Sequence, residues 1–165
     1  MIPSRRQLIL SGAAWVLAGR AAARPAGNDV HLHGIDDLRP LLAQVRARRI
    51  PLLVLFSTPG CPYCLEVRRN YLAPRVAEQA SLPAPDLLIR EVDITSRAAL
   101  VDAQGRRTTQ ADFASQFGVR VVPVVALIDD RAQLLGDPLV GIDRSGFYEA
   151  YLARAIDEAR RRLRS

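Results

Sequence analysis

Residues 51–64 read PLLVLFSTPGCPYC, and this stretch decides the fold. The continuous apolar run over 51–57 predicts a strand that is buried on both faces, as in a parallel sheet. Cys61 and Cys64 follow it directly and are the only two cysteines in 165 residues. Pro62 suits the first position of a helix, where no backbone N–H is needed. The stretch therefore predicts a buried strand that turns into a helix at Cys61.

The place of Cys61 at the start of a helix favours redox chemistry. The unpaired N–H groups and the positive end of the helix dipole stabilise a thiolate there, and the thiolate is the reactive species. Cys64 lies one helical turn later and can attack a mixed disulfide formed at Cys61. We interpret the two as a catalytic pair in which Cys61 exchanges and Cys64 resolves. Tyr63 lies in the dipeptide between them, which sets the redox poise.

Three other uses of two cysteines compete with this interpretation. A zinc site needs four ligands, and His31 and His33 could complete one, but structural zinc sites commonly take paired ligands from adjacent turns. The histidines are better interpreted as surface or edge-strand residues. A structural disulfide would close too short a loop to remove much chain entropy, and inert buried cysteines do not fit the turn into a helix. We expect no metal and no cofactor besides the redox-active disulfide Cys61–Cys64.

The rest of the chain predicts alternating strands and helices. The first half is expected to contain a short strand at 30–34, a helix over 35–49 capped by Asp36 or Asp37, the strand at 51–57 and the cysteine helix with a kink at Pro74. A strand over 87–94 and an irregular insertion at 95–107 follow. The second half is expected to contain a helix over 109–117 capped by Thr108 or Thr109 and ended by Gly118, a strand over 119–129 with a proline near its start, a strand over 134–141 and a terminal helix over 145–164. This order implies an α/β fold, a central mixed sheet flanked by helices, with an antiparallel edge.

The first 23 residues predict an export signal. Arg5 and Arg6 form a basic start, an apolar run follows at 8–18, and small residues at 21–23 form an A-x-A cleavage site. The apolar run is too short for a membrane span, which takes about 20 residues. The paired arginines resemble a twin-arginine signal. We expect cleavage after about Ala23, a linker over 24–29, one domain over 30–165, and a location in the periplasm.

The predicted location and the composition limit the kinds of partner that we expect. The formal net charge is +6, but the basic residues form neither a patterned face with aromatics nor a nucleic-acid motif. We expect no nucleic-acid partner. In an oxidising space, thiols form disulfides unless another molecule keeps them reduced. The expected partners are therefore periplasmic protein disulfides or thiols and a membrane thiol relay as electron donor, with membrane contact only through that donor.

A buried strand, a CxxC motif that opens a kinked helix, and a late VVP before another strand resemble the thioredoxin superfamily over residues 30–160. The resemblance implies that Cys61 is the exposed nucleophile and Cys64 the buried resolving cysteine. It also implies that Pro123 is a cis-proline packed against the disulfide. Val122 before it would offer its N–H and C=O to an extended substrate. Pro62 and Tyr63 complete the expected substrate-binding residues.

The subfamily is less sharply defined by the motifs. Pro62-Tyr63 is the usual glutaredoxin dipeptide, but the segment between Cys64 and Pro123 is long and no paired-glycine glutathione site follows Pro123. The pattern VDAQGRRTTQADFASQFGVRVVPVVALIDD at 101–130 resembles exported thioredoxin-like reductases, including those associated with sulfur-oxidation (Sox) systems. The resemblance implies a thiol-disulfide oxidoreductase that reduces partner disulfides. A disulfide oxidase or isomerase, a glutaredoxin-like enzyme and a non-catalytic binding module stay as alternatives.

The strand before the motif departs from the thioredoxin pattern. Leu55 stands where thioredoxins carry a buried aspartate, and Ser57 and Gly60 replace the flanking tryptophans. Loss of a buried carboxylate removes repulsion against a thiolate, so we expect a lower pKa at Cys61 and a less reducing couple. Glu91, in the next predicted strand, either supplies a carboxylate instead or is an exposed strand residue. The sequence leaves both options open.

Overall fold

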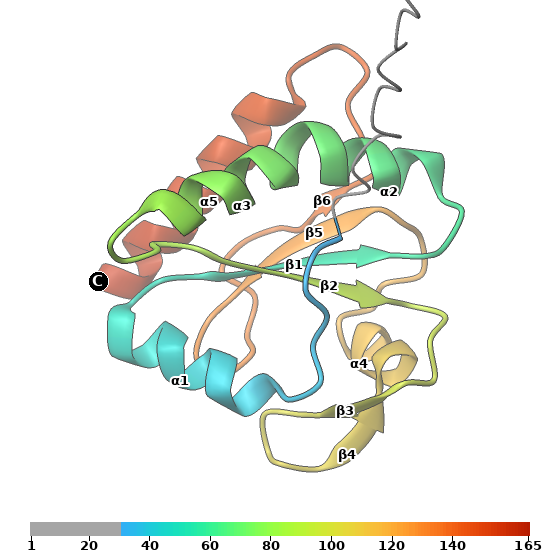
Figure 1. The fold of residues 1–165 in the computed structure, drawn as a ribbon, viewed down its shortest axis with the longest axis vertical. Helices are drawn as coiled ribbons and strands as arrows, with labels where there is room; N and C mark the ends of the chain where they lie inside the picture. Colours follow the sequence, from blue (N-terminus) through green and yellow to red (C-terminus); the bar gives the residue numbers. More distant parts are fainter. Residues whose placement is uncertain (1–30) are drawn as a thin grey trace, which may run out of the picture.

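The apolar run before the cysteines is the central strand of a four-stranded sheet (Figure 1). In the computed structural model, which describes residues 31–165, all of strand β1 is buried. The sheet has the order β2-β1-β5-β6, with bounds β1 (Leu52–Ser57), β2 (Leu88–Asp93), β5 (Val124–Ile128) and β6 (Leu139–Val140). β1 runs parallel to β2 and antiparallel to β5, and β6 adds an antiparallel edge. The predicted mixed sheet is confirmed.

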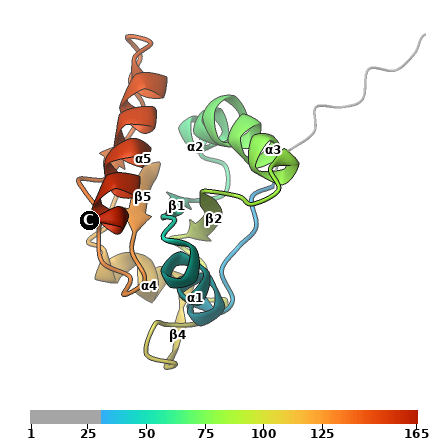
Figure 2. The same ribbon diagram turned by 90° about the vertical axis from the view of Figure 1, so that its left-hand side faces the viewer.

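Helices cover both faces of this sheet (Figures 1 and 2). Their bounds are α1 (Leu38–Arg48), α2 (Pro62–Val67), α3 (Ala73–Ser81), α4 (Gln110–Gln116) and α5 (Tyr148–Arg164). Because side chains alternate along a strand, Val54 and Phe56 point into the core under α1 and α4. Leu53 and Leu55 point into the opposite core, against α2 and α5. The fold is three layers with a hydrophobic core on each face of the sheet.

An aromatic cluster fixes α4 against β1. The ring centroids of Phe56 and Phe113 are 6.2 Å apart, and Phe117 lies 5.6 Å from Phe56 and 5.0 Å from Phe113. Aromatic pairs at such distances contribute beyond the area that they bury. The helix is capped by Thr109 and followed by Gly118 at φ +67°, as the sequence predicts. This cluster closes the core on the face that lies away from α2.

The cysteine helix is interrupted one turn after the motif. A π-helical segment η1 (Arg68–Leu72) separates α2 from α3, and Pro74 lies in the first turn of α3. Proline has no N–H to donate and its ring clashes with the preceding turn, so a regular α-helix cannot run through it. The predicted kink is thus present as a π-helical turn. Val67, directly before this segment, and Leu72, its last residue, are fully buried against the sheet.

The insertion at 95–107 is more regular than predicted. It contains β3 (Ala99–Val101) and β4 (Arg107–Thr109), which form a two-stranded antiparallel sheet. Asp102 closes the hairpin turn by accepting hydrogen bonds from the backbone N–H groups of Gln104 and Arg106 and from the Arg106 side chain. The prediction of an irregular segment is therefore wrong. Strands of three residues are too short to show an alternation of apolar and polar side chains in the sequence.

Other boundaries also differ from the prediction. Residues 31–34 are not a strand. The Glu91 N–H donates a hydrogen bond to the His33 carbonyl, but within residues 31–165 no ladder of such bonds forms there. The strand expected over 119–129 begins only at Val124, since Pro123 has no N–H for the ladder. The strand expected over 134–141 is reduced to β6 and an isolated bridge between Ile128 and Leu134.

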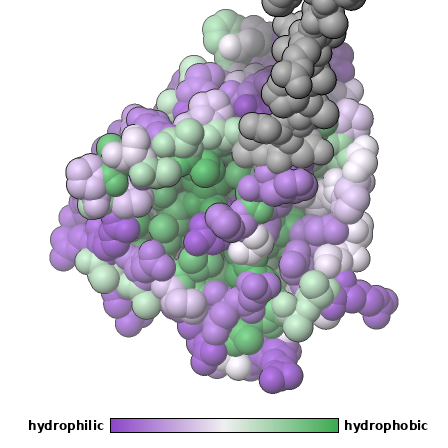
Figure 3. Space-filling view, in the orientation of Figure 1, coloured by the Kyte–Doolittle hydropathy of each residue, from purple (hydrophilic) through white to green (hydrophobic). Residues whose placement is uncertain are grey.

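The face in Figure 3 carries apolar residues at its centre, between α3 and α1, with hydrophilic side chains around them. Among residues 31–165, no helix is long and apolar enough to cross a membrane. The predicted export signal at 1–23, the linker at 24–29 and residue 30 lie outside the described residues.

Candidate active site

Cys61 and Cys64 form a disulfide at the start of α2, with their Cα atoms 5.3 Å apart. Cys61 is the N-cap of the helix, and its sulfur accepts a hydrogen bond from the Cys64 N–H at 3.1 Å. Cys64 is fully buried, whereas Cys61 is partly exposed. The helix start thus presents one sulfur to an incoming group and keeps the other beneath it. The same N–H would stabilise a thiolate at Cys61 in the reduced form.

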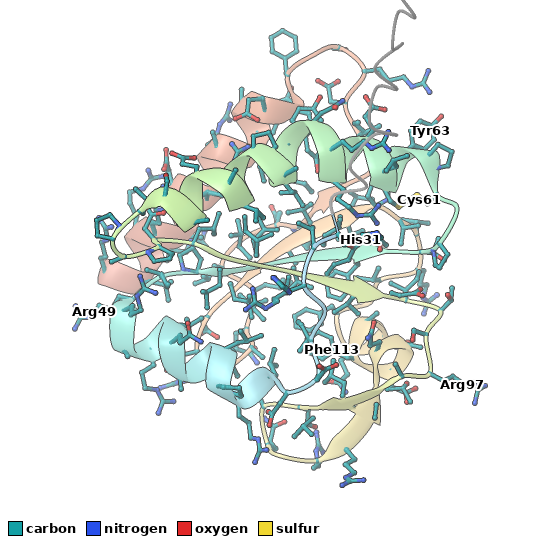
Figure 4. All side chains as sticks on the ribbon, in the orientation of Figure 1. His31, Arg49, Cys61, Tyr63, Arg97 and Phe113 are labelled. Carbon is teal, nitrogen blue, oxygen red and sulfur yellow. A yellow bond between two sulfur atoms is a disulfide. The ribbon has the colours of Figure 1, made fainter. Side chains whose placement is uncertain are left out.

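The residues around the disulfide follow the turn from strand to helix. Gly60 has φ +74°, a left-handed conformation that strains any residue with a Cβ atom. This explains the small residue directly before Cys61. Pro62 occupies the first turn of α2. Tyr63 is exposed and lies at the same end of the molecule as Cys61 (Figure 4).

The VVP segment has the expected backbone. The peptide bond between Val122 and Pro123 is cis. The Pro123 carbonyl accepts a hydrogen bond from the Gly141 N–H at 2.8 Å, which ties the segment to the end of β6. Within residues 31–165, neither the N–H nor the C=O of Val122 has a recorded hydrogen-bond partner. A backbone in this state can pair with one residue of an extended chain.

A hollow of about 640 Å³ lies on one side of Cys61. Among the side chains that line it are Ser57, Arg68 and Glu91. Glu91 accepts hydrogen bonds from Ser57 Oγ at 2.5 Å and from Arg68 Nε at 3.0 Å, and a second one from the Arg68 Nη2 group. Both ends of the ion pair are mostly buried, with 15% of the Glu91 side chain and 19% of the Arg68 side chain exposed.

This arrangement decides between the two options for Glu91. It lies directly across from Leu55 in the register of β1 and β2, and its carboxylate faces inward. The hollow therefore does hold a carboxylate, supplied by β2 in place of β1. Because Arg68 neutralises it, the pair places no net negative charge beside the cysteines. The option of an exposed strand residue is wrong.

The Tyr63 side chain makes a contact that the sequence does not predict. Arg144 Nη2 donates a hydrogen bond to the Tyr63 hydroxyl at 2.6 Å, and the guanidinium carbon lies 5.3 Å from the ring centroid. Arg144 follows β6, and Asp143 before it holds the local turn. The Asp143 carboxylate accepts hydrogen bonds from the N–H groups of Ser145 and Phe147, and these bonds hold the pKa of Asp143 below its usual range. The Asp-x-Ser turn was the only local signal for this loop.

The two histidines, His31 and His33, are exposed residues of the segment that precedes α1. His31 is among the residues that line the hollow beside Cys61. Among residues 31–165, no three His, Cys, Asp or Glu side chains are grouped so that they could hold a metal ion.

Comparison with known proteins identifies the family of this chain. The family described as the thioredoxin-like domain matches residues 38–155, a range that includes both cysteines and Pro123. No curated protein matches the chain significantly. Similar solved structures include mitochondrial thioredoxin 3 from Saccharomyces cerevisiae, with 18% identity over 77% of this chain and 94% of that one and a TM-score of 0.48. Another is thioredoxin from Fasciola hepatica, with 17% identity over 78% and 99% and a TM-score of 0.49. The chain belongs to the thioredoxin-like family, and with its Cys-x-x-Cys pair it is a thiol-disulfide oxidoreductase.

Proposed function

We propose that this thioredoxin-like oxidoreductase is an exported reductase that keeps cysteines of periplasmic partner proteins reduced. The observation that carries the proposal is the unequal exposure of the two sulfurs, with Cys61 partly exposed and Cys64 fully buried. A partner disulfide can meet the first sulfur only. The second is held one turn below it, where it can act only after the first has reacted.

The exchange takes two steps. The Cys61 thiolate attacks one sulfur of the partner disulfide, so that bond breaks, a mixed disulfide forms, and the released partner sulfur takes a proton from water. Cys64 loses its proton and attacks the Cys61 sulfur. The mixed disulfide breaks, the second partner sulfur leaves and is protonated, and the Cys61–Cys64 disulfide forms. Two electrons and two protons pass from the dithiol to the partner.

The neighbouring residues bind the partner in this proposal. The unpaired N–H and C=O of Val122 pair with the partner segment beside its reactive cysteine, as a short β-bridge. Pro123 fixes the direction of that backbone, and Pro62 and Tyr63 form the other side of the contact. Each of these four residues lies within the motif or the VVP segment that resembles the superfamily.

The proposal needs a second molecule to restore the dithiol. The chain has only two cysteines, so it cannot both receive electrons and relay them through a further pair of its own. A membrane thiol relay would supply them, in keeping with the export signal predicted at 1–23, and the proposal requires no cofactor besides the disulfide. The resemblance at 101–130 favours a partner in a sulfur-oxidation (Sox) or periplasmic thiol-maintenance system.

Reduction of insulin disulfides by the purified protein with dithiothreitol tests the activity. The wild type should precipitate reduced insulin, Cys61→Ser should be inactive, and Cys64→Ser should trap mixed disulfides with its substrate. A Cys61→Ser protein that keeps its biological function, or a purified protein that contains one metal ion per chain, would favour a binding module instead. Turnover of a small glutathione mixed disulfide would favour a glutaredoxin.

The direction of the reaction needs its own measurement, because Leu55 in place of a carboxylate favours an oxidase or isomerase. The equilibrium reduction potential of Cys61–Cys64 can be read from gels against a glutathione series. A value near about −270 mV supports the reductase, and a value of about −120 to −180 mV supports the oxidase or isomerase.

A further inference from the structure

The segment at 141–147 joins the two sides of the disulfide. At its start, the Gly141 N–H is bonded to the Pro123 carbonyl, beside the backbone proposed to bind the partner. In its middle, Arg144 contacts Tyr63 in the cysteine dipeptide. A partner chain that pairs with Val122 and reaches Cys61 therefore passes next to this segment.

The charge of Arg144 is not neutralised within the described part of the chain. Its one hydrogen bond goes to a neutral phenol, and no acidic side chain among residues 31–165 forms an ion pair with it. The carboxylate of Asp143 is turned to backbone N–H groups of its own loop. Glu66, on the same helix as Tyr63, does not pair with Arg144 either. Arg120, before the VVP segment, is a second exposed arginine without an acidic partner among the described residues.

Exposed apolar side chains lie on the chain segments that carry Arg144 and the VVP backbone. Val121, Val140 and Phe147 have 58%, 65% and 58% of their surface exposed, respectively. Val121 is the first residue of the VVP segment. Val140 pairs with Val124 across β5 and β6, and Phe147 ends the segment that carries Arg144. Exposed apolar residues next to a reactive group are typical of protein interaction sites.

We propose that Arg144 selects the partner by binding an acidic residue next to the cysteine that reacts with Cys61. A guanidinium has five N–H donors in a planar fork, and the bond to Tyr63 uses one of them. The others can bind a carboxylate with two parallel hydrogen bonds. The inference rests on the proposed function and adds the chemistry of its substrate: an extended, acidic, cysteine-bearing segment of a protein.

Tyr63 orients the arginine for this contact. The hydrogen bond to the Tyr63 hydroxyl and the contact with its ring together hold the guanidinium beside the cysteine motif. Less conformational freedom of Arg144 is therefore lost when a carboxylate binds. Tyr63 is thus a positioning residue for the charge, in addition to its place between the cysteines.

Paired peptide substrates test the proposal. Each peptide contains one disulfide, and the two members of a pair differ by Glu or Gln at one position flanking the cysteine, with each flanking position tried in turn. The readout is the ratio of kcat/KM for the Glu peptide to kcat/KM for the Gln peptide, measured for the full protein at low salt. At the best position, we expect the wild type to give a ratio of about 2 to 5, as one solvent-exposed charge pair would.

The variants separate Arg144 from general charge effects. Arg144→Gln should bring the ratio close to 1, Arg144→Glu should bring it below 1, and Tyr63→Phe should lower it in part. Arg49→Gln is the matched control, because Arg49 is an exposed arginine at the opposite end of the molecule from Cys61 (Figure 4). This control should keep the wild-type ratio and lose the same net charge.

Three results would overturn the inference: a wild-type ratio of 1 at every position, an Arg144→Gln ratio equal to that of the wild type, or equal losses in Arg144→Gln and Arg49→Gln. A protein that reduces none of the peptides, although its own disulfide can be reduced, would instead overturn the proposed function on which the inference rests. The two failures are therefore distinguishable in one experiment.

Discussion

Two arginines flank the disulfide in opposite circumstances. Arg68 is mostly buried in the hollow and makes two hydrogen bonds to Glu91. Arg144 is exposed, and its hydrogen bond within residues 31–165 goes to the Tyr63 hydroxyl. A charge removed from water needs an opposite charge beside it, and its removal is felt by the whole fold. A solvated charge without such a partner costs little and stays available to another molecule. The comparison teaches that the first arginine is committed to the fold, whereas the second keeps donors for the partner that we propose.

The largest expected effect comes from breaking the buried pair. Glu91→Gln keeps the shape of the side chain but leaves Arg68 without a counter-charge in the hollow. We expect a loss of about 2 to 3 kcal/mol in the free energy of unfolding, somewhat below the usual cost for a fully buried pair because both groups keep some contact with water. Urea denaturation followed by far-UV circular dichroism measures it. Arg144→Gln, by contrast, should change the free energy of unfolding by less than about 0.5 kcal/mol.

Removing both charges of the buried pair should have a smaller effect. In Glu91→Gln with Arg68→Met, no charge is left unpaired, and methionine can fill the space of the arginine stem. We expect stability within about 1 kcal/mol of the wild type. If the double variant is less stable than Glu91→Gln alone, Arg68 stabilises the fold by packing and not through its charge, and the contrast with Arg144 loses its basis.

The sequence predicts a feature well when the residues that determine it are close together along the chain, and poorly when they are far apart. The central strand, the helix start at Cys61 and the cap at Thr109 follow from neighbouring residues, because burial and capping act over a few positions. The Arg68–Glu91 pair was outside the reach of such reasoning, since it depends on the register of β1 and β2. The Arg144–Tyr63 contact joins residues 81 positions apart, and no local pattern encodes the fold-back that brings them together.

Short elements were missed for a related reason. In the hairpin of β3 and β4, Leu100 is the one fully buried apolar side chain, so there is too little alternation to indicate strands. The hairpin depends on Asp102, which satisfies three donors at the turn. The sequence does contain that aspartate, but a single turn residue does not fix which residues on either side pair.

The smallest expected effect concerns the turn that Asp143 forms next to Arg144. The pKa of Asp143 is lowered by the backbone N–H groups of Ser145 and Phe147, so in the folded state it keeps its charge at a lower pH than in the unfolded chain, where the pKa is about 3.9. Its charged form therefore stabilises the fold above that value, and the contribution is lost as the pH falls through the folded pKa. Asp143→Asn should lower the Tm slightly at pH 7, and the difference from the wild type should shrink below about pH 4.

The same variant sharpens the comparison between the two arginines. Asparagine has one carbonyl oxygen in place of two carboxylate oxygens, so one of the two N–H bonds is lost and the turn loosens around Arg144. We expect the preference for acidic peptides to fall while the midpoint of urea unfolding stays close to that of the wild type. If the preference is unchanged, Tyr63 alone positions the arginine and the turn is only a connection. If instead the preference rises, Asp143 competes with the substrate for Arg144, and the guanidinium is less free than its contacts indicate.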